Sequence, residues 1–196
     1  MTYEEIKRLA LELFSQKGFE GTTIKDIAKK SGLKPSSIYS HITSKEGLFL
    51  DILKDCMKNG GQSVKNINDY IINEDGCDSV EALRQYHFAI TKHFVENKEE
   101  YLFLRQVTSF INGKYGVDNN ISANVIINGT TIDFFKSFFV ELKQQGRIID
   151  KSNEELFYIY AGTIIAYLEE KLVYNIPLDD EHINMFWRGF WKSIKK

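Results

Sequence analysis

Residues 22–49 read TTIKDIAKKSGLKPSSIYSHITSKEGLF, and this stretch decides the fold of the N-terminal part of the chain. Ile24 and Ile27 recur at helical spacing directly after two threonines that can cap a helix. Gly32 then supplies a left-handed turn, and Pro35 suits the first turn of a second helix, where its missing N–H would be unpaired anyway. Two short helices joined by a tight glycine turn predict a helix-turn-helix.

The second short helix is expected over residues 35–42, with Ile38 turned towards the small core. Its outward positions carry short hydroxyls, one aromatic ring and one imidazole: Ser36, Ser37, Tyr39, Ser40 and His41. Such a row suits a helix that enters the major groove of DNA, about 12 Å wide, where side chains meet the base edges. The alternative for Tyr39 and His41 is that both rings pack between helices.

Charge is distributed unevenly along the chain. The formal net charge is −2, but residues 1–50 hold eight lysines and arginines against six acidic residues, a net of +2. Residues 22–49 alone hold five lysines against two acidic residues, a net of +3. A small cationic patch on an acidic body is typical of a module that faces phosphates, although three charges also fall within ordinary surface variation.

The rest of the chain also predicts helices. Capping boxes at Thr2 with Glu5 and at Ser152 with Glu155 mark two helix starts, and Gly18 ends the first helix. Helical periodicity extends from residue 45 towards 72 and over 79–96, 98–112, 120–145, 153–174 and 180–194. The pair Gly60 and Gly61 predicts a kink or break, because each internal glycine costs about 1 kcal/mol relative to alanine.

Composition excludes several classes of protein. The 196 residues are 43% hydrophobic and 27% charged, which is typical of a chain that buries a core. No apolar run reaches the ~20 residues of a membrane span, and acidic residues stand where a secretory signal needs basic and apolar ones, so we expect a cytoplasmic protein. Cys56 and Cys77 form no ligand cluster, so neither a disulfide scaffold nor a cysteine-based zinc site is expected.

Residues 5–53 resemble the N-terminal DNA-binding domain of the TetR family of bacterial transcriptional regulators. The positions that carry the resemblance are Ala10, Phe14, Gly18, Ile24, Ala28, Gly32, Ser37, Tyr39, His41, Ser44, Lys45 and Phe49. The family usually has phenylalanine after the histidine, whereas this chain has Ile42. Beyond residue 53, the chain is similar to the family only in length and helical content.

The resemblance implies an all-α fold of about nine helices with two domains. Residues 1–45 would form the helix-turn-helix domain, and residues 46–196 an effector-binding and dimerisation domain. It further implies a homodimer that binds a double-stranded operator, regulates transcription as a repressor, and is released by a small-molecule effector. The implied DNA contacts are Thr23, Lys25, Lys34, Ser36, Ser37, Tyr39, Ser40, His41 and Lys45.

The two C-terminal helices resemble the family's four-helix dimer interface, because small residues and an aromatic stripe recur there at helical spacing. The candidate interface residues are Ala161, Gly162, Ala166, Ile183, Phe186, Trp187, Phe190 and Trp191. The alternative is that this stripe belongs to the core of a single chain. The candidate effector residues are Tyr86, Phe103, Gln106, Phe110, Asn128 and Thr131, for which a core role is again the alternative. The aromatic residues favour a largely apolar effector.

An enzyme is not expected, because no catalytic or phosphate-binding motif occurs. His87 and His93 lie six residues apart and so point in different directions on one helix. The adjacent acids Glu99 and Glu100 are interpreted as solvated surface. No cofactor and no metal are therefore expected, and no membrane partner. The alternative function is a helical protein-interaction module that retains the helix-turn-helix as a scaffold.

Overall fold

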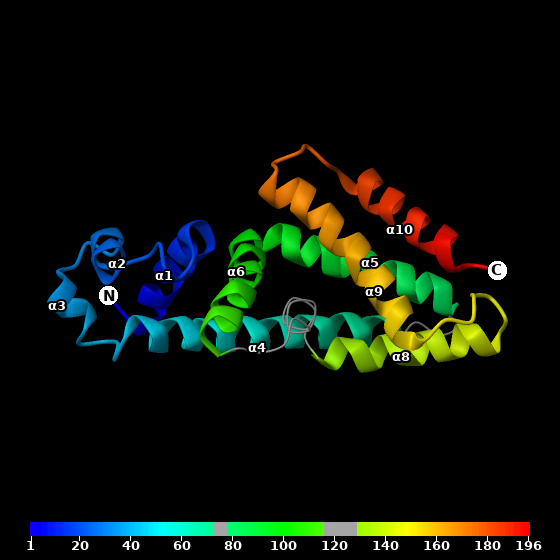
Figure 1. The fold of residues 1–196 in the computed structure, drawn as a ribbon, viewed down its shortest axis with the longest axis horizontal. Coiled ribbons are helices and arrows are strands. Elements are labelled where there is room, and N and C mark those ends of the chain that lie inside the picture. The colour runs from blue at the N-terminus through cyan, green and yellow to red at the C-terminus, as the bar shows by residue number, and fades with distance from the viewer. Residues whose placement is uncertain (73–77, 116–128) are drawn as a thin grey trace. The chain divides into compact units, whose positions relative to one another are not determined.

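The computed structural model describes residues 1–72, 78–115 and 129–196, without the side chains of 60–61, 63–65, 67–72, 108–115 and 129–134. Over these residues the fold is all-α, with nine α-helices, one short π-helix and no strand (Figure 1). The helices are α1 Tyr3–Lys17, α2 Ile24–Lys30, α3 Pro35–Ile38, α4 Lys45–Ile72, α5 Ser79–Glu96, α6 Lys98–Tyr115, α8 Gly129–Gln144, α9 Asn153–Leu168, η1 Glu169–Val173 and α10 Asp180–Ile194. None of these helices is long and apolar enough to cross a bilayer.

Local capping chemistry sets the helix starts. The capping boxes predicted at Thr2 and Ser152 are both formed, with each side chain bound to the backbone N–H three residues on. Thr23 with Asp26 and Asp179 with His182 form two more. Each box satisfies two N–H groups that the first helical turn leaves free, so these starts depend only on nearby sequence.

The helix α3 is shorter than the predicted range of 35–42. The Ser40 hydroxyl donates to the Ser37 carbonyl over 2.7 Å, and the His41 N–H donates to the Ile38 carbonyl over 2.9 Å. In a regular α-helix, the His41 N–H would donate to the Ser37 carbonyl instead. The serine side chain therefore competes with the backbone, and α3 passes into turns after Ile38.

Of the predicted kink or break at Gly60 and Gly61, the break is wrong, because α4 runs without interruption from Lys45 to Ile72. The kink stays a prediction. Two glycines cost about 2 kcal/mol of helix relative to alanine, but intrinsic propensity is a weak preference that flanking helical turns override. The range predicted at 98–112 extends to Tyr115 as α6, and that at 120–145 is described from Gly129 as α8. The range 153–174 ends as α-helix at Leu168 and continues as the π-turn η1.

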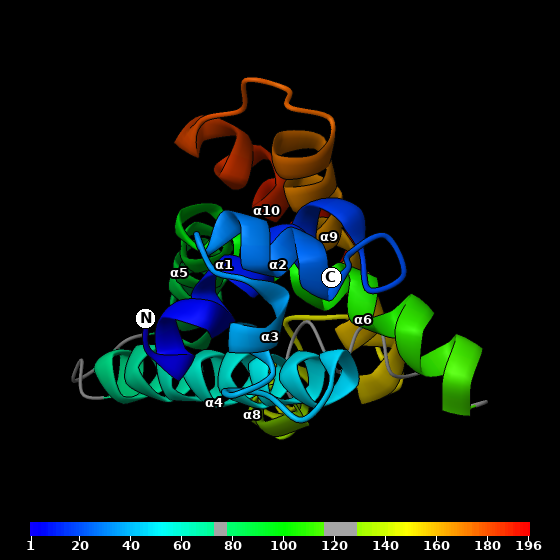
Figure 2. The same cartoon turned by 90° about the vertical axis from the view of Figure 1, so that its left-hand side faces the viewer.

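The described chain divides into two compact units. Unit 1 comprises α1, α2, α3, the part of α4 up to Asn59, and α6, and Figure 2 views it from the side of α1–α3. Its centre is aromatic: the Phe49 ring lies 5.1 Å from Phe14 and 4.8 Å from Phe103, measured between ring centroids. These three wholly buried rings join α1, α4 and α6. The expected helix-turn-helix segment, residues 1–45, lies within this unit.

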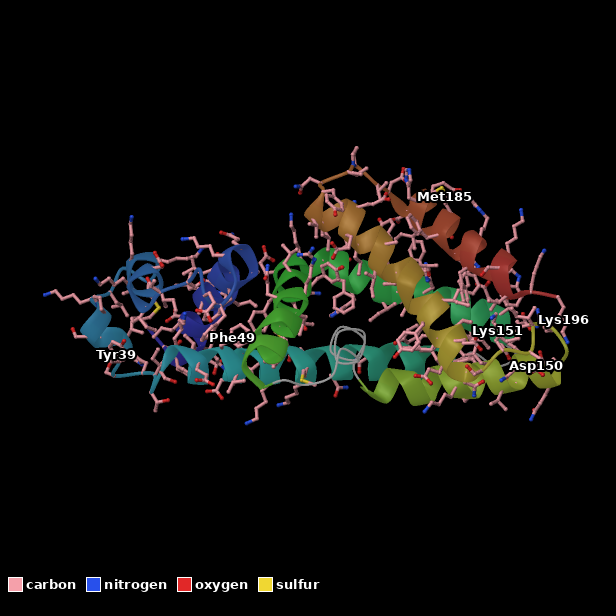
Figure 3. The ribbon with its side chains drawn as sticks, in the orientation of Figure 1. Tyr39, Phe49, Asp150, Lys151, Met185 and Lys196 are labelled. Carbon is pink, nitrogen blue, oxygen red and sulfur yellow. The ribbon has the colours of Figure 1, made fainter. Side chains whose placement is uncertain are left out.

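Unit 2 contains the remainder of α4 together with α5, α8, α9, η1 and α10. The helix α9 packs against α5, α8 and α10, and the wholly buried Tyr160 ring lies 4.4 Å from Phe135 and 5.1 Å from Phe190. The C-terminus is fixed by backbone hydrogen bonds, including one from Ile149 N–H to the Ile194 carbonyl, so Asp150, Lys151 and Lys196 lie at one end of unit 2 (Figure 3).

Glu100, in the first turn of α6, is not the solvated residue that its sequence context predicts. Its side chain is 9% exposed, and Oε1 has no hydrogen-bond partner in the part of the chain that the structure describes. Burial raises the pKa of this carboxyl from 4.5 to about 7. A raised folded-state pKa means that the folded chain binds the proton more tightly. Stability is therefore full below the unfolded-state value and is lost as pH rises through 7.

We predict that Glu100→Gln raises the free energy of unfolding by about 1–2 kcal/mol at pH 8 and changes it little at pH 4.5. The reason is that glutamine has nearly the same shape but never carries the buried charge. Urea unfolding at both pH values measures the effect. Glu99→Gln, at the exposed neighbouring position, is the control. An equal pH dependence in the wild type and Glu100→Gln would contradict the prediction.

Candidate nucleic-acid interface

The turn between α2 and α3 has the geometry that the glycine predicts. Gly32 adopts a φ of 66°, in the left-handed region, and the Leu33 N–H donates to the Ala28 carbonyl over 2.9 Å. Ile27, Ala28 and Ile38 are buried where the two helices meet. This small core fixes one face of α3 and leaves its opposite face bare.

The bare face of α3 carries most of the predicted contact residues. Ser36, Tyr39, Ser40 and His41 are exposed, and Ser37 is half-buried. Tyr39 is 57% exposed and lies on the outer surface beside α3 (Figure 3). An exposed aromatic ring of this size contributes little to the fold, so packing between helices does not account for Tyr39. The same exposure argues against packing for His41.

Two predicted cations of the helix-turn-helix segment lack ion-pair partners among the described residues. Lys25 at the start of α2 and Lys34 just before α3 are exposed, and neither forms an ion pair with any described residue. In contrast, Lys30 pairs with Glu12 over 2.7 Å. Thr23 uses its hydroxyl for the cap of α2, where Oγ1 accepts from the Asp26 N–H over 3.1 Å. The unpaired lysines are therefore the charges available to a phosphate.

Lys45 has a second use that the sequence did not indicate. Its ammonium donates to the Phe19 carbonyl over 2.7 Å and to the Thr22 carbonyl over 2.9 Å. The same nitrogen lies 4.0 Å from the centroid of the Phe19 ring. Because an ammonium has three donors, one N–H remains for a phosphate. Lys45 thus fastens the start of α4 to the turn that precedes α2.

The candidate dimer residues separate into buried and accessible groups. Ala161, Ile183, Trp187 and Phe190 are buried in the core of unit 2, Phe186 and Trp191 are half-buried, and Gly162 and Ala166 are exposed. The core alternative therefore accounts for four of the eight residues. The sequence did not single out Tyr158 and Met185, which are 42% and 49% exposed on α9 and α10. The signal for Tyr158 was available, because α9 is apolar on nearly all sides beyond its first turn.

The described candidate effector residues belong to different units of the structure. Tyr86 is buried in unit 2, whereas Phe103 and Gln106 belong to unit 1. Phe103 lies in the aromatic core there, which accounts for it without a ligand. The side chains of Phe110 and Thr131, and the whole of Asn128, lie outside the described residues.

Comparison with known proteins agrees with this geometry. Residues 6–52 match a family model described as bacterial regulatory proteins, tetR family. A negative transcriptional regulator of the icaADBC biofilm operon, IcaR of Staphylococcus aureus strain Newman, is 27% identical over 83% of this chain and 82% of its own length. IcaR of Staphylococcus epidermidis is 31% identical over 48% of this chain and 46% of its own length.

Solved structures share the fold over nearly the whole chain. The ketosteroid transcriptional regulator KstR2 of Mycobacterium tuberculosis superimposes with a TM-score of 0.73, at 15% identity and 99% and 95% coverage of the two chains. The fatty acid degradation regulator FadR of Bacillus halodurans gives 0.70, at 14% identity and 96% and 94% coverage. At these identities the likeness shows the fold alone.

We predict that Lys45→Met lowers the free energy of unfolding by about 1–2 kcal/mol, because it removes two hydrogen bonds from a charged donor and leaves two carbonyls without that partner. Lys34→Met, at an exposed position without such bonds, is the matched control and should stay within about 0.5 kcal/mol of the wild type. Urea unfolding measures both. Equal stabilities of the two variants would show that Lys45 does not fasten α4.

Proposed function

Because the chain belongs to the tetR family of bacterial regulatory proteins and is a transcriptional regulator, we propose that it acts as a dimeric repressor released from its operator by an effector. The observation that carries the proposal is the exposed face of α3 with Ser36, Ser40 and Tyr39. The same helix-turn-helix segment also holds two exposed lysines, Lys25 and Lys34, without ion-pair partners among the described residues. Residues 1–45 serve as the DNA-binding domain, and residues 46–196 as the effector and dimer domain. A protein that binds an operator in a bacterium works in the cytoplasm, where the DNA lies.

On the operator, side chains beside α3 divide the work of binding. Tyr39, His41, Lys25 and Lys34 contact phosphates, which set affinity and orientation but carry no sequence information. Ser40 reads bases: while its hydrogen points to the Ser37 carbonyl, its oxygen is free to accept from a base amino group. Short serines make few bidentate contacts, so phosphates and bridging waters supply much of the affinity.

Dimerisation is supported by two glycines in the middle of exposed helical surface. A Cβ added at Gly162 of α9 or Gly189 of α10 would meet no atom of a described residue within 4 Å. Each glycine nevertheless lowers the stability of its helix by about 1 kcal/mol relative to alanine. Packing within the single chain does not explain why glycine stands at these positions. Close approach of a partner helix supplies the reason, and the exposed Tyr158 and Met185 lie on the same two helices.

A dimer is also what an operator requires. Two recognition elements on one face of DNA must lie about 34–36 Å apart, or a multiple of that distance. A ligand that binds more tightly to a dimer with a different spacing of these elements lowers the affinity for the operator. The size of the effect is set by the ratio of the ligand's affinities for the two dimer conformations. This is the step by which effector binding would release the repressor.

Repression and release rest on narrower observations. The two IcaR relatives are negative regulators by name, which supports repression here. In unit 2 the hydroxyl of the wholly buried Tyr160 has no hydrogen-bond partner among the described residues, a feature typical of a polar group that awaits a ligand or water. The surrounding aromatic rings favour a largely apolar effector. A ligand of unit 2 that leaves operator affinity unchanged would contradict its role as that effector.

The alternative, a protein-interaction module that uses the helix-turn-helix only as a scaffold, is less well supported. A scaffold role does not explain why Tyr39 is exposed or why Lys25 and Lys34 have no ion-pair partners among the described residues. The relatives are transcription regulators and not enzymes. Salt separates the two functions, because the log of DNA affinity falls by about 0.9 per neutralised phosphate for each unit of log salt concentration.

We predict that Tyr39→Ala raises the Kd for DNA about tenfold on all sequences, through the loss of a phosphate contact, while Ser40→Ala changes base preference at one position per half-site. Selection of bound duplexes, followed by titration at several salt concentrations, measures both. Tyr174→Ala is the matched control, since this tyrosine is 68% exposed in unit 2. Equal DNA affinity for the two tyrosine variants would remove Tyr39 from the interface.

We predict that Gly162→Arg raises the dimer dissociation constant at least about 100-fold, because it places a bulky charge where helices meet. The single chain has room for the side chain, so helix content should be unchanged. Sedimentation velocity with circular dichroism measures both quantities. Gln144→Arg, on the exposed surface of α8, should remain dimeric. A dimeric Gly162→Arg protein would place the interface elsewhere.

A further inference from the structure

Unit 1 contains a cavity of about 190 Å³ away from the bare face of α3. It lies among residues of α1, α4 and the first turn of α6, including Lys7, Leu11, Ile52, Asp55, Cys56 and Glu100. A water molecule takes up about 30 Å³ of liquid, so this space holds about six non-hydrogen atoms. The cavity is thus sized for a small molecule.

The charged groups around the cavity leave one carboxyl unpaired. The Lys7 ammonium is engaged by Asp55 over 2.5 Å and by Glu4 over 2.9 Å. Arg8 pairs with Glu12 over 3.0 Å. Glu100 lines the same space from α6, nine-tenths buried and without any ion pair among the described residues. When Glu100 is ionised, the lining carries an excess of negative charge that no internal cation balances.

The remaining walls are apolar or neutral. Ile52 is 3% exposed and Leu11 is half-buried. Burial, together with the nearby Glu100 and Asp55 carboxylates, raises the pKa of the Cys56 thiol to about 12, so it stays neutral. Among the described residues, no group of three or more histidine, cysteine and acidic side chains is arranged to hold a metal ion. A buried carboxylate beside methylene walls therefore suits an organic cation better than a metal.

We propose that this cavity binds a small aliphatic amine, whose ammonium group pairs with Glu100 while its methylene chain lies against Leu11, Ile52 and Cys56. An ammonium group donates up to three hydrogen bonds and supplies the charge that the carboxylate lacks. A four-carbon diamine has six non-hydrogen atoms and fills the space. This site goes beyond the proposed function, since neither operator binding nor dimerisation requires it.

Binding depends on pH through Glu100. The other titratable groups that line the cavity with Glu100 are Cys56, whose thiol is influenced by the Glu100 carboxylate, and Asp55, Glu4, Lys7 and Arg8. Since burial raises the pKa of Glu100 to about 7, the free carboxyl is mostly ionised at pH 8 and mostly protonated at pH 6. An ammonium ion stays charged over this range, so affinity falls about tenfold from pH 8 to pH 6. At pH 6 binding also releases a proton from Glu100.

Isothermal titration of the full chain with 1,4-diaminobutane, at constant ionic strength, tests the proposal. At pH 8 the wild type should bind one equivalent with a Kd on the order of 1 mM, a value within reach of six non-hydrogen atoms. Glu100→Gln should weaken binding at least about tenfold. Glu99→Gln removes the same charge one residue away, at an exposed position, and should bind as the wild type does.

Two measurements make the result independent of any variant. At pH 6 the heat of binding to the wild type should change with the ionisation enthalpy of the buffer, because a proton is released, whereas at pH 8 it should not. The neutral analogue 1,4-butanediol should bind at least about tenfold more weakly at pH 8. Both results would support an ion pair with Glu100.

The proposal is overturned if the wild type fails to bind the diamine up to about 50 mM. It is equally overturned if Glu99→Gln and Glu100→Gln bind alike, or if butanediol binds as tightly as the diamine. None of these outcomes bears on operator binding, which is measured separately without amine. Failure of the amine site would therefore leave the proposed repressor function as it stands.

Discussion

One aromatic contact underlies the arrangement of unit 1. The Phe49 ring on α4 lies about edge-on to Phe14 of α1 and to Phe19 after it, each 5.1 Å away, and 4.8 Å from Phe103 of α6. Because closely packed rings tolerate little displacement, this cluster fixes three helices that are distant in sequence. The recognition segment depends on it, since α2 packs on α1 and α3 packs on α2. The exposed residues of α3 are therefore held in place by a core to which they do not themselves contribute.

That division explains why Lys45 differs from Lys25 and Lys34. A residue that binds an external phosphate must leave its donors free, whereas one that fixes the scaffold must use them. Lys45 has given two donors to the turn before α2 and retains one. A phosphate on that last donor would couple binding to the junction of α4 with the helix-turn-helix. Lys25 and Lys34 can contribute charge alone.

The sequence predicts those structural features that depend only on residues close together in the chain. The capping boxes at Thr2 and Ser152 and the left-handed turn at Gly32 need only a few adjacent residues, and each was found as predicted. Helical periodicity indicated the aromatic stripe that includes Trp187 on α10. Periodicity alone does not distinguish packing within one chain from packing between two chains. Glu100 was misread for the same reason, since its burial depends on α1 and α4, which lie far from it in sequence. The early end of α3 was not predictable, because it depends on the hydrogen bond from the Ser40 hydroxyl to the Ser37 carbonyl.

Four features of the isolated chain lower its stability without a visible gain. Gly162 and Gly189 weaken their helices, the Tyr160 hydroxyl is buried without a partner among the described residues, and the Glu100 carboxyl must ionise away from water near neutral pH. Natural sequences keep such local conflicts mainly where something outside the fold compensates for them. The chemistry of each indicates a different occupant: a second helix at the glycines, a hydrogen-bonding ligand at Tyr160, and a cation at Glu100. Binding any of these would stabilise the folded chain by an amount that grows with the logarithm of the occupant's concentration once this exceeds its Kd. The unfolding free energy of this protein should therefore depend on its own concentration as well as on its ligands.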